Sequence, residues 1–213
     1  DDIPGGTIHV AQGTYSEVLY IISTSFTLRG GYLDNGDGTV NWATRSPEDL
    51  PTVIENSGTI TAVLRLQSVS SFTLDGITVR NTTTSGGSNP NRTVYVDGST
   101  GTFANSRIVA SAGNYPIGLD VVSASDVSAS SSVFTSLTLE SGYDTAEVNS
   151  SSYAVQVGLG TSDTSSLEIT NSEIRAARPA GTTNPTTAGI RSVSSSQLTV
   201  SDSVIYGGDP GDD

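Results

Sequence analysis

The chain has 213 residues, 22 of them acidic and nine basic, and a formal net charge of −13 at pH 7. All nine basic residues are arginine, and Lys, Met and Cys are absent. This composition excludes a disulfide framework, a thiolate nucleophile and a thiolate metal site, and it argues against nucleic acid or an anionic membrane as a partner.

Two features concern the compartment in which this segment works. The chain begins at Asp1-Asp2-Ile3-Pro4 without an initiating Met or a signal peptide, as a segment processed or excised from a longer protein would. It also contains no apolar run long enough to insert into a membrane. We therefore expect a piece of an exported protein, located outside the cell or on its surface.

Taken in order, the chain consists of short apolar strands separated by polar turns. Residues 7–33 are strand-rich, and residues 34–51 interrupt them with an inserted loop that carries the only Trp. From residue 61 onward each unit has a leading strand, a recurring phrase and a polar loop of variable length. We expect one domain over residues 1–206, followed by a linker or tail over residues 207–213.

The recurring phrase places an apolar residue, a small residue two places later, and a second apolar residue five places after the first. Six copies begin at Leu28, Leu74, Phe103, Phe134, Ile169 and Val200. Their second apolar residues are Leu33, Val79, Ile108, Leu139, Ile174 and Ile205. We expect each set to form one apolar ladder, with the chain bending at the small residue between them.

A repeat of about 30 residues built from short strands is typical of a solenoid. The predicted fold is all-β, a parallel β-helix of about six to seven coils. Serines in the middle of the phrase, such as Ser106, Ser172 and Ser203, are predicted to hydrogen-bond the neighbouring coil. A β-sandwich of antiparallel hairpins is the alternative, but it gives no reason for a 30-residue repeat.

Several segments resemble a known group of proteins. The segments 7–17 (Thr-Ile-His-Val-Ala-Gln-Gly-Thr-Tyr-Ser-Glu), 26–32 (Phe-Thr-Leu-Arg-Gly-Gly-Tyr), 72–81 and 167–174 are similar to coils of right-handed parallel β-helix proteins. These form the pectate-lyase-like superfamily, which includes bacterial surface proteins related to polymorphic outer membrane proteins. The resemblance and the general preference of parallel crossovers imply right-handed coiling. Because the superfamily includes lyases, hydrolases and non-catalytic adhesins, the resemblance does not choose among activities.

Outward positions of the phrase are where a β-helix enzyme would keep its carboxylates. Neither outward column places two carboxylates on neighbouring coils, as glycoside hydrolysis by an acid–base pair requires. In the leading strands, Asp97 and Asp120 are candidate neighbours, one coil apart. They predict either a calcium site or half of an acid pair, or else two solvated carboxylates on an acidic rod. Apart from this possible calcium, no cofactor is expected.

Aromatic residues near the insertion supply a second candidate site. Trp42 and Tyr32 are placed to stack on a sugar ring, or Trp42 folds back to cover the first open coil. His9, the only histidine, is predicted to point outward as surface decoration. The segment Asp34-Asn-Gly-Asp37-Gly lacks the spacing of a calcium loop and predicts a turn. Three Asn-x-Ser/Thr sequons, at Asn81, Asn91 and Asn149, fall in predicted loops.

Two function classes follow from these observations. The first is a non-catalytic segment that acts as a stalk, an adhesin or a filament subunit, with end-to-end self-association if its terminal coils are uncapped. The alternative is a polysaccharide lyase or hydrolase, or a carbohydrate-binding module, with a glycan or cell-surface ligand as its partner. The missing carboxylate pair favours the first class.

Overall fold

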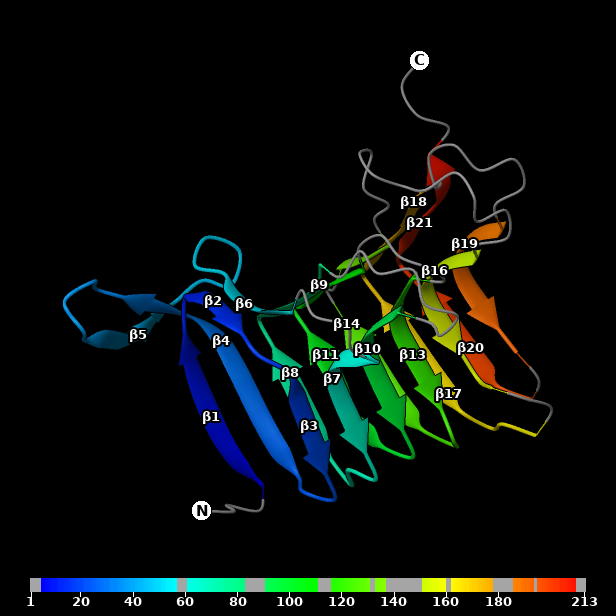
Figure 1. Ribbon diagram of the computed structural model, residues 1–213, viewed down its shortest axis with the longest axis horizontal. Helices are drawn as coiled ribbons and strands as arrows, with labels where there is room; N and C mark the ends of the chain where they lie inside the picture. The colour runs from blue at the N-terminus through cyan, green and yellow to red at the C-terminus, as the bar shows by residue number, and fades with distance from the viewer. Residues whose placement is uncertain are drawn as a thin grey trace.

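The computed structural model describes residues 5–56, 61–82, 91–110, 116–130, 133–136, 151–159, 162–177, 186–193 and 195–209. Within these residues all regular structure is β, so no helix is long and apolar enough to cross a membrane. The strands wind into an elongated solenoid, and Figure 1 shows them side by side along its length.

Three parallel sheets form the walls of the solenoid. Sheet A contains β1 (Gly6–Ala11), β4 (Phe26–Asp34), β8 (Phe72–Asp75), β11 (Thr100–Ala104), β14 (Asp126–Ser130), β17 (Ser166–Thr170) and β20 (Gln197–Ser201). Sheet B contains β2 (Gly13–Ser16), β6 (Thr52–Asn56), β9 (Ile77–Asn81), β12 (Arg107–Ala110), β15 (Val133–Ser136), β18 (Glu173–Ala177) and β21 (Val204–Asp209). Sheet C contains β3 (Leu19–Ile22), β7 (Ala62–Gln67), β10 (Asn91–Asp97), β13 (Pro116–Val122), β16 (Ser151–Val157) and β19 (Thr186–Ser192).

Each coil contributes one strand to sheet A, then one to sheet B, then one to sheet C. Among the described residues this gives six coils with all three strands, and a seventh formed by β20 and β21. The predicted parallel β-helix of six to seven coils is confirmed. The last strand runs to Asp209, into the segment predicted as a tail.

Two apolar ladders run along the interior, as the repeat predicts. In sheet A, Leu28 lies opposite Leu74, Leu74 opposite Phe103, and Ile169 opposite Val200. In sheet B, Val79 lies opposite Ile108, and Ile174 opposite Ile205. From Leu74 to Ile174, the ladder residues whose burial is described are almost inaccessible to solvent. Each coil thus buries its apolar residues against the coils on either side.

One copy of the phrase is assigned incorrectly by the sequence pattern. Phe134 does not lie in the sheet A ladder but in sheet B, where it pairs with Ile108 and Ile174. Ala129 holds the sheet A position, between Phe103 and Ile169. Ala129 is small, whereas its neighbour Phe103 is large, and a pattern defined by bulky apolar residues therefore does not include it. Leu139 lies outside the described residues.

The first copy is also corrected, because the insertion divides it. Leu33 continues β4 beyond the sheet and lies opposite Asn41 in an antiparallel pair with β5 (Val40–Arg45). Ile54 takes the expected place of Leu33 in the sheet B ladder. Much of the predicted loop 34–51 is therefore a β-hairpin arm, which projects past β1 in Figure 1.

The corner between sheets A and B has the predicted bend at the small residue. Gly76, Asn105, Asn171 and Asp202 all have positive φ, between 48° and 71°. This left-handed conformation is readily adopted by Gly and tolerated by Asn and Asp. The predicted serine bonds are present too: Ile77 N donates to Ser106 Oγ (3.4 Å), and Ser172 N donates to Ser203 Oγ (3.0 Å).

A second serine stack lies at the corner between sheets C and A. Val69 N donates to Ser99 Oγ (2.9 Å), Ser99 N to Ser125 Oγ (3.1 Å), and Ser125 N to Ser165 Oγ (3.2 Å). All three serines are buried. Their hydroxyls satisfy backbone donors that turn inward at this corner, where an unpaired N–H would be costly.

Asp163 ends this stack and fastens two coils together. Its carboxylate accepts hydrogen bonds from the backbone N–H groups of Ser123 (2.9 Å), Ala124 (3.3 Å), Leu159 (2.9 Å) and Ser165 (2.9 Å). Ser123 and Ala124 both have positive φ, so their successive N–H groups converge on the carboxylate. Burial opposes ionisation, but the hydrogen bonds from Ser165, Ser123 and Leu159 prevail and place the pKa of Asp163 far below its ordinary value.

Gly101 provides a test of how tightly the interior is packed. A Cβ at Gly101 would lie 2.3 Å from the ring of Phe72, which is itself packed against Phe103. We expect Gly101→Ala to lower the free energy of unfolding by about 1–3 kcal/mol, the usual cost of overpacking. Urea denaturation measures this, with Ser128→Ala on the outer face as the control. A Gly101→Ala protein as stable as the control would contradict the described packing.

Asp163 gives a prediction for pH dependence. Because its pKa is lower in the folded protein than the value near 3.9 of an unfolded chain, its contribution is present above about pH 3.9. That contribution is lost as the pH falls toward the folded-state pKa. We expect Asp163→Asn to cost about 2–3 kcal/mol at pH 7, since bonds to a charged acceptor are replaced. Denaturation at pH 7 and pH 3 should show a smaller difference between the two proteins at pH 3, and an equal difference would contradict this assignment.

Candidate functional site

One column of side chains on the outer face of sheet C is polar and aromatic along its whole length. One residue from each of six successive strands lies opposite the next. We call this column the ladder face: Tyr20, Arg65, Tyr95, Asp120, Gln156 and Arg191. At a strand spacing of about 4.8 Å it is roughly 24 Å long, which suits an extended ligand.

Arginine and tyrosine side chains contact one another on and beside this face. The guanidinium carbon of Arg65 lies 4.9 Å from the ring centroid of Tyr20 and 5.4 Å from that of Tyr95. Arg92, beside the column, lies 4.7 Å from Tyr95. Arg191 lies 5.1 Å from the ring of Tyr153. These cation–π contacts hold the planar groups in place and leave edges of Tyr20, Arg65 and Arg191 accessible to solvent.

Asp120 is the buried carboxylate of the ladder face. It is 0% exposed and accepts hydrogen bonds from Arg92 Nε (2.5 Å) and Gln156 Nε2 (3.0 Å). Burial raises the pKa of Asp120, and the hydrogen bond and charge of Arg92 offset this only in part. Arg191 in turn donates to Gln156 Oε1 (3.2 Å), so the network crosses four coils from Arg92 to Arg191.

The predicted contact between Asp97 and Asp120 is wrong by two residues. The register places Asp120 opposite Tyr95 and Asp97 opposite Val122. Each carboxylate has an arginine instead: Arg92 for Asp120, and Arg65 at 3.9 Å for Asp97. In the described part of the chain no three His, Asp or Glu side chains gather as a metal site. Both strands have seven residues, but Asp97 is the last residue of β10 whereas Asp120 is the fifth of β13.

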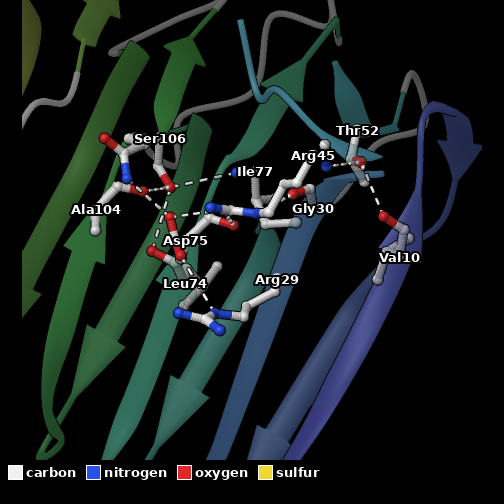
Figure 2. Close-up of polar contacts among 12 residues, drawn as sticks. Val10, Arg29, Gly30, Arg45, Thr52, Leu74, Asp75, Ile77, Ala104 and Ser106 are labelled. Atoms are coloured by element: carbon white, nitrogen blue, oxygen red, sulfur yellow. Dashed lines mark hydrogen bonds and ion pairs between the residues drawn. The ribbon is translucent and has the colours of Figure 1, made fainter. Parts of the chain in front are cut away.

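A second polar cluster surrounds Asp75 on the outside of sheet A. Its carboxylate contacts Arg45 (2.7 Å), Arg29 (3.3 Å) and Asn105 Nδ2 (2.9 Å), as Figure 2 shows for the labelled arginines. Burial would raise the pKa of Asp75, but the bonds from Asn105 and Arg45 and the two positive charges outweigh it, so the pKa lies below its ordinary value.

Arg45 links this cluster to the hairpin arm. It also donates to the backbone oxygens of Gly30 (2.9 Å) and Asp75 (3.1 Å), so one side chain binds the arm to two coils. Nearby, Gly31 N donates to Thr52 Oγ1 (2.9 Å), and that hydroxyl donates to Ala11 O (2.9 Å). The cluster is thus a structural anchor for the arm.

The structure separates the two predicted aromatic site residues by their exposure. Tyr32 is 4% exposed, whereas Trp42 is 53% exposed on the arm. Their rings meet at 5.5 Å, and His9 stacks on Tyr32 at 4.9 Å. Trp42 does not line the open first coil, so it lies against the outer surface rather than over the end. Trp42 is thus more than half exposed and meets the rings of Tyr32 and His9 in edge-on contacts.

The remaining sequence candidates have local roles. Asp34 Oδ1 accepts from Gly36 N (2.9 Å) and Asp37 Oδ1 from Thr39 N (2.9 Å), so this segment forms the predicted turn. The sequon residues Asn81 and Asn91 do not lie in loops: they are buried residues of β9 and β10. Asn149 lies outside the described residues.

A shallow polar hollow marks the outer face of sheet A. It has a volume of about 480 Å³ and is lined by hydroxyl and carboxylate side chains from neighbouring strands, including Thr73, Thr102, Ser128, Glu168 and Thr199. These five residues lie opposite one another on successive strands, and none of them is aromatic, in contrast to the ladder face. It offers hydrogen bonds but little apolar surface for a ring to rest on.

Comparison with known proteins gives a likeness of fold. No family model matches the chain, and no curated protein matches it. Two crystal structures of the pectin methylesterase from Aspergillus niger, one deglycosylated and one penultimately deglycosylated, are similar to it at 14% sequence identity. The TM-scores are 0.42 and 0.43, over 98% of this chain and 79–80% of the enzyme's. This likeness concerns the fold, and it does not transfer an activity.

Sequence reasoning missed most of the ladder face. Its residues are dispersed over six strands, and only Asp120 was selected beforehand. A visible signal was present in the leading strands, where an arginine or tyrosine stands between apolar residues, as in Leu64-Arg65-Leu66 and Val94-Tyr95-Val96. Aligning these strands would have placed Arg65 beside Tyr95.

The anchor at Asp75 yields a prediction about the arm. We expect Arg45→Ala to release the arm locally, because it removes the ion pair and both backbone hydrogen bonds while the rest of the coil stack remains. Trp42 is the only tryptophan, so its fluorescence anisotropy and quenching report the arm directly. Quenching by acrylamide should rise while the melting of the β-sheet signal shifts by only a few degrees.

The matched control is Arg80→Ala, which removes a partly buried pair with Glu55 at 3.3 Å on sheet B. It should leave Trp42 unchanged. If Arg45→Ala also leaves Trp42 unchanged, the arm is held by other contacts.

Proposed function

We propose that this chain is a non-catalytic, extracellular or cell-surface β-helix that acts as an adhesin-like rod and binds a carbohydrate on the ladder face. The observation that supports this most is the run Tyr20, Arg65 and Tyr95 on sheet C, in which the guanidinium group lies between two tyrosine rings. Aromatic faces suit the apolar side of a sugar ring, and arginine forks suit carboxylates and hydroxyls.

Charge favours an acidic glycan as the ligand. The chain as a whole carries −13, but Arg65, Arg92 and Arg191 gather on one face against Asp97 and Asp120. Arg92 is committed to Asp120 at 2.5 Å, whereas Arg65 reaches Asp97 only at 3.9 Å. Arg191 has no ion pair among the described residues. Arg65 and Arg191 therefore have donors to offer a uronate carboxylate.

The carboxylates of this face support binding rather than cleavage. Glycoside hydrolysis uses two carboxyl groups on either side of the bond, one of them free to give or take a proton. Asp120 is buried beneath Arg92 and Gln156, and its neighbours in the column are Tyr95 and Gln156. Because Asp120 and Gln156 are buried, a ligand on this face would meet the phenol and guanidinium groups of Tyr20, Arg65, Tyr95 and Arg191.

A glycan array tests the proposal. We expect binding to uronate-containing polysaccharides that weakens with salt, and no release of shorter products from them. Arg65→Gln should weaken binding about tenfold, the equivalent of one hydrogen bond to a charged group. Arg107→Gln, which removes an equal charge from the outer face of sheet B, should leave binding unchanged. Equal losses in both variants would point to general electrostatics and contradict a specific site.

The alternative is a polysaccharide lyase or hydrolase centred on Asp120, and its raised pKa is the observation in its favour. This alternative predicts turnover on a panel of uronate and neutral glycans, abolished in Asp120→Asn. Turnover by the unmodified protein that disappears in this variant would replace the binding proposal with an enzymatic one.

A further inference from the structure

The turn of the hairpin arm carries a residue pair that occurs nowhere else in the chain. Asn35 directly precedes Gly36, and this is the only Asn-Gly pair in the sequence. Residues 34–39 are all exposed, and they join β4 to β5 on the arm that projects past β1 in Figure 1. The pair is therefore open to water on a segment that neither the coil packing nor the ladder face uses.

The groups that react in asparagine deamidation are adjacent in this turn. In that reaction the backbone nitrogen of the following residue attacks the side-chain carbonyl carbon of the asparagine. Gly36 N donates a hydrogen bond to Asp34 Oδ1 (2.9 Å), so a carboxylate already contacts the proton that this nitrogen must lose. A Cβ at Gly36 would meet no atom within 4 Å, which shows that the space beside the attacking nitrogen is open.

The leaving nitrogen of Asn35 also has a defined place. Asn35 Nδ2 donates to Thr39 Oγ1 (2.9 Å), and Asn35 N donates to Thr39 O (3.1 Å) across the turn. The same hydroxyl donates to Asp37 Oδ1 (2.5 Å). The nitrogen that leaves as ammonia is thus in contact with a hydroxyl that can exchange protons with it.

Asn171 shows what protects an asparagine elsewhere in the chain. It is exposed and precedes a small residue, as Asn35 does. However, Ser172 is buried in a coil corner, and its backbone nitrogen donates to Ser203 Oγ (3.0 Å). A nitrogen held by the stacked coils in this way is not free to attack the preceding side chain.

Asp37 is a comparison within the turn itself, because it too precedes a glycine. The hydroxyl and the backbone N–H of Thr39 both donate to its carboxylate, and these bonds lower the pKa of Asp37. An ionised carboxylate is a poor electrophile, whereas the neutral amide of Asn35 keeps a reactive carbonyl carbon. Asn35 is therefore the reactive member of this turn.

We propose that Asn35 is a site of spontaneous deamidation, at which the arm modifies itself without an enzyme. Gly36 N gives its proton to Asp34 Oδ1 and forms a bond to the side-chain carbonyl carbon of Asn35. The bond from that carbon to Nδ2 breaks, and the nitrogen takes up the released proton through solvent and leaves as ammonia. Water then opens the cyclic imide at either carbonyl, which gives an aspartate or an isoaspartate. Nothing is oxidised or reduced, and water is the only co-reactant.

The product changes both the charge and the geometry of the arm. It adds one negative charge to the net charge of −13 and places a new carboxylate between Asp34 and Asp37. It also removes the Nδ2 donor to Thr39 Oγ1, and an isoaspartate adds one carbon atom to the main chain. Because like charges at short range repel, the turn becomes less stable as the protein ages. This change does not depend on a ligand at the ladder face.

Peptide mapping of the purified, folded protein tests the proposal. Trypsin cuts after Arg29 and Arg45, so the whole turn is recovered in one peptide, residues 30–45. During incubation at pH 8 we expect this peptide to gain the mass that replaces NH₂ by OH. Fragmentation should locate the change at Asn35 and show both aspartate and isoaspartate products. The peptide that contains Asn171 should stay unchanged.

Variants of the turn identify the attacking nitrogen. Gly36→Ala should slow the conversion at least about tenfold, because its methyl group crowds the nitrogen and a φ of 77° does not suit alanine. Gly38→Ala is the matched control, since Gly38 also has positive φ and an open space at its Cβ. It should convert like the unmodified protein. Equal slowing in both variants would contradict attack by Gly36 N.

A change of Asp34 tests the base. Asp34→Asn keeps an acceptor for Gly36 N but cannot take its proton. At pH 6 it should slow the conversion about tenfold, and at pH 9, where hydroxide removes the proton, the difference should disappear. An unchanged rate at both pH values would show that Asp34 does not act as the base.

A synthetic peptide of residues 30–45 gives the rate without the folded arm. We expect the folded protein to convert within about tenfold of this peptide. A folded protein that stays unmodified while the peptide converts overturns the proposal, and so does conversion of Asn171 at the same rate as Asn35. Arg65→Gln should convert normally, which keeps this test independent of carbohydrate binding.

Discussion

The structure depends on parallel strands stacking in register, coil upon coil. Each strand of a middle coil gives its backbone groups to the coils on both sides, and each apolar residue has its neighbour one coil away. Leu74 between Leu28 and Phe103 is an example, with 1% of its surface exposed. No coil has a core of its own, so stability is shared between neighbours as in other repeat proteins.

Stacking in register satisfies the backbone hydrogen-bonding groups of the strands. At the corners, backbone N–H groups turn away from the sheets and need other acceptors. The two serine stacks and Asp163 meet this need from the inside, since a hydroxyl can accept from one coil and donate to another. Ser125 does both: it accepts from Ser99 N and donates to Val122 O at 2.5 Å. The high Ser content is therefore partly a consequence of the corners, although the composition alone looks like that of a disordered chain.

The repeat spacing was enough to predict the solenoid, the bends at Asn105 and Asn171, and most of both ladders. It failed where a unit departs from the average in size or length. Ala129 is too small to be noticed as a ladder residue, and the hairpin arm separates Leu28 from Ile54. The ladder face was largely missed because its contacts join residues about 30 positions apart, such as Arg92 and Asp120. The pairing register of two such strands depends on the lengths of all the loops between them, and these lengths vary from coil to coil.

The stacking of coils also determines which side chains are paired with one another and which are exposed to solvent. Along the sides, charged and aromatic side chains pair with each other across coils, which leaves the ladder face ordered before any ligand arrives. Under the proposed function, Tyr20, Arg65 and Arg191 are the members of this face that a ligand would meet first, since Asp120 and Gln156 are buried within the pairing network.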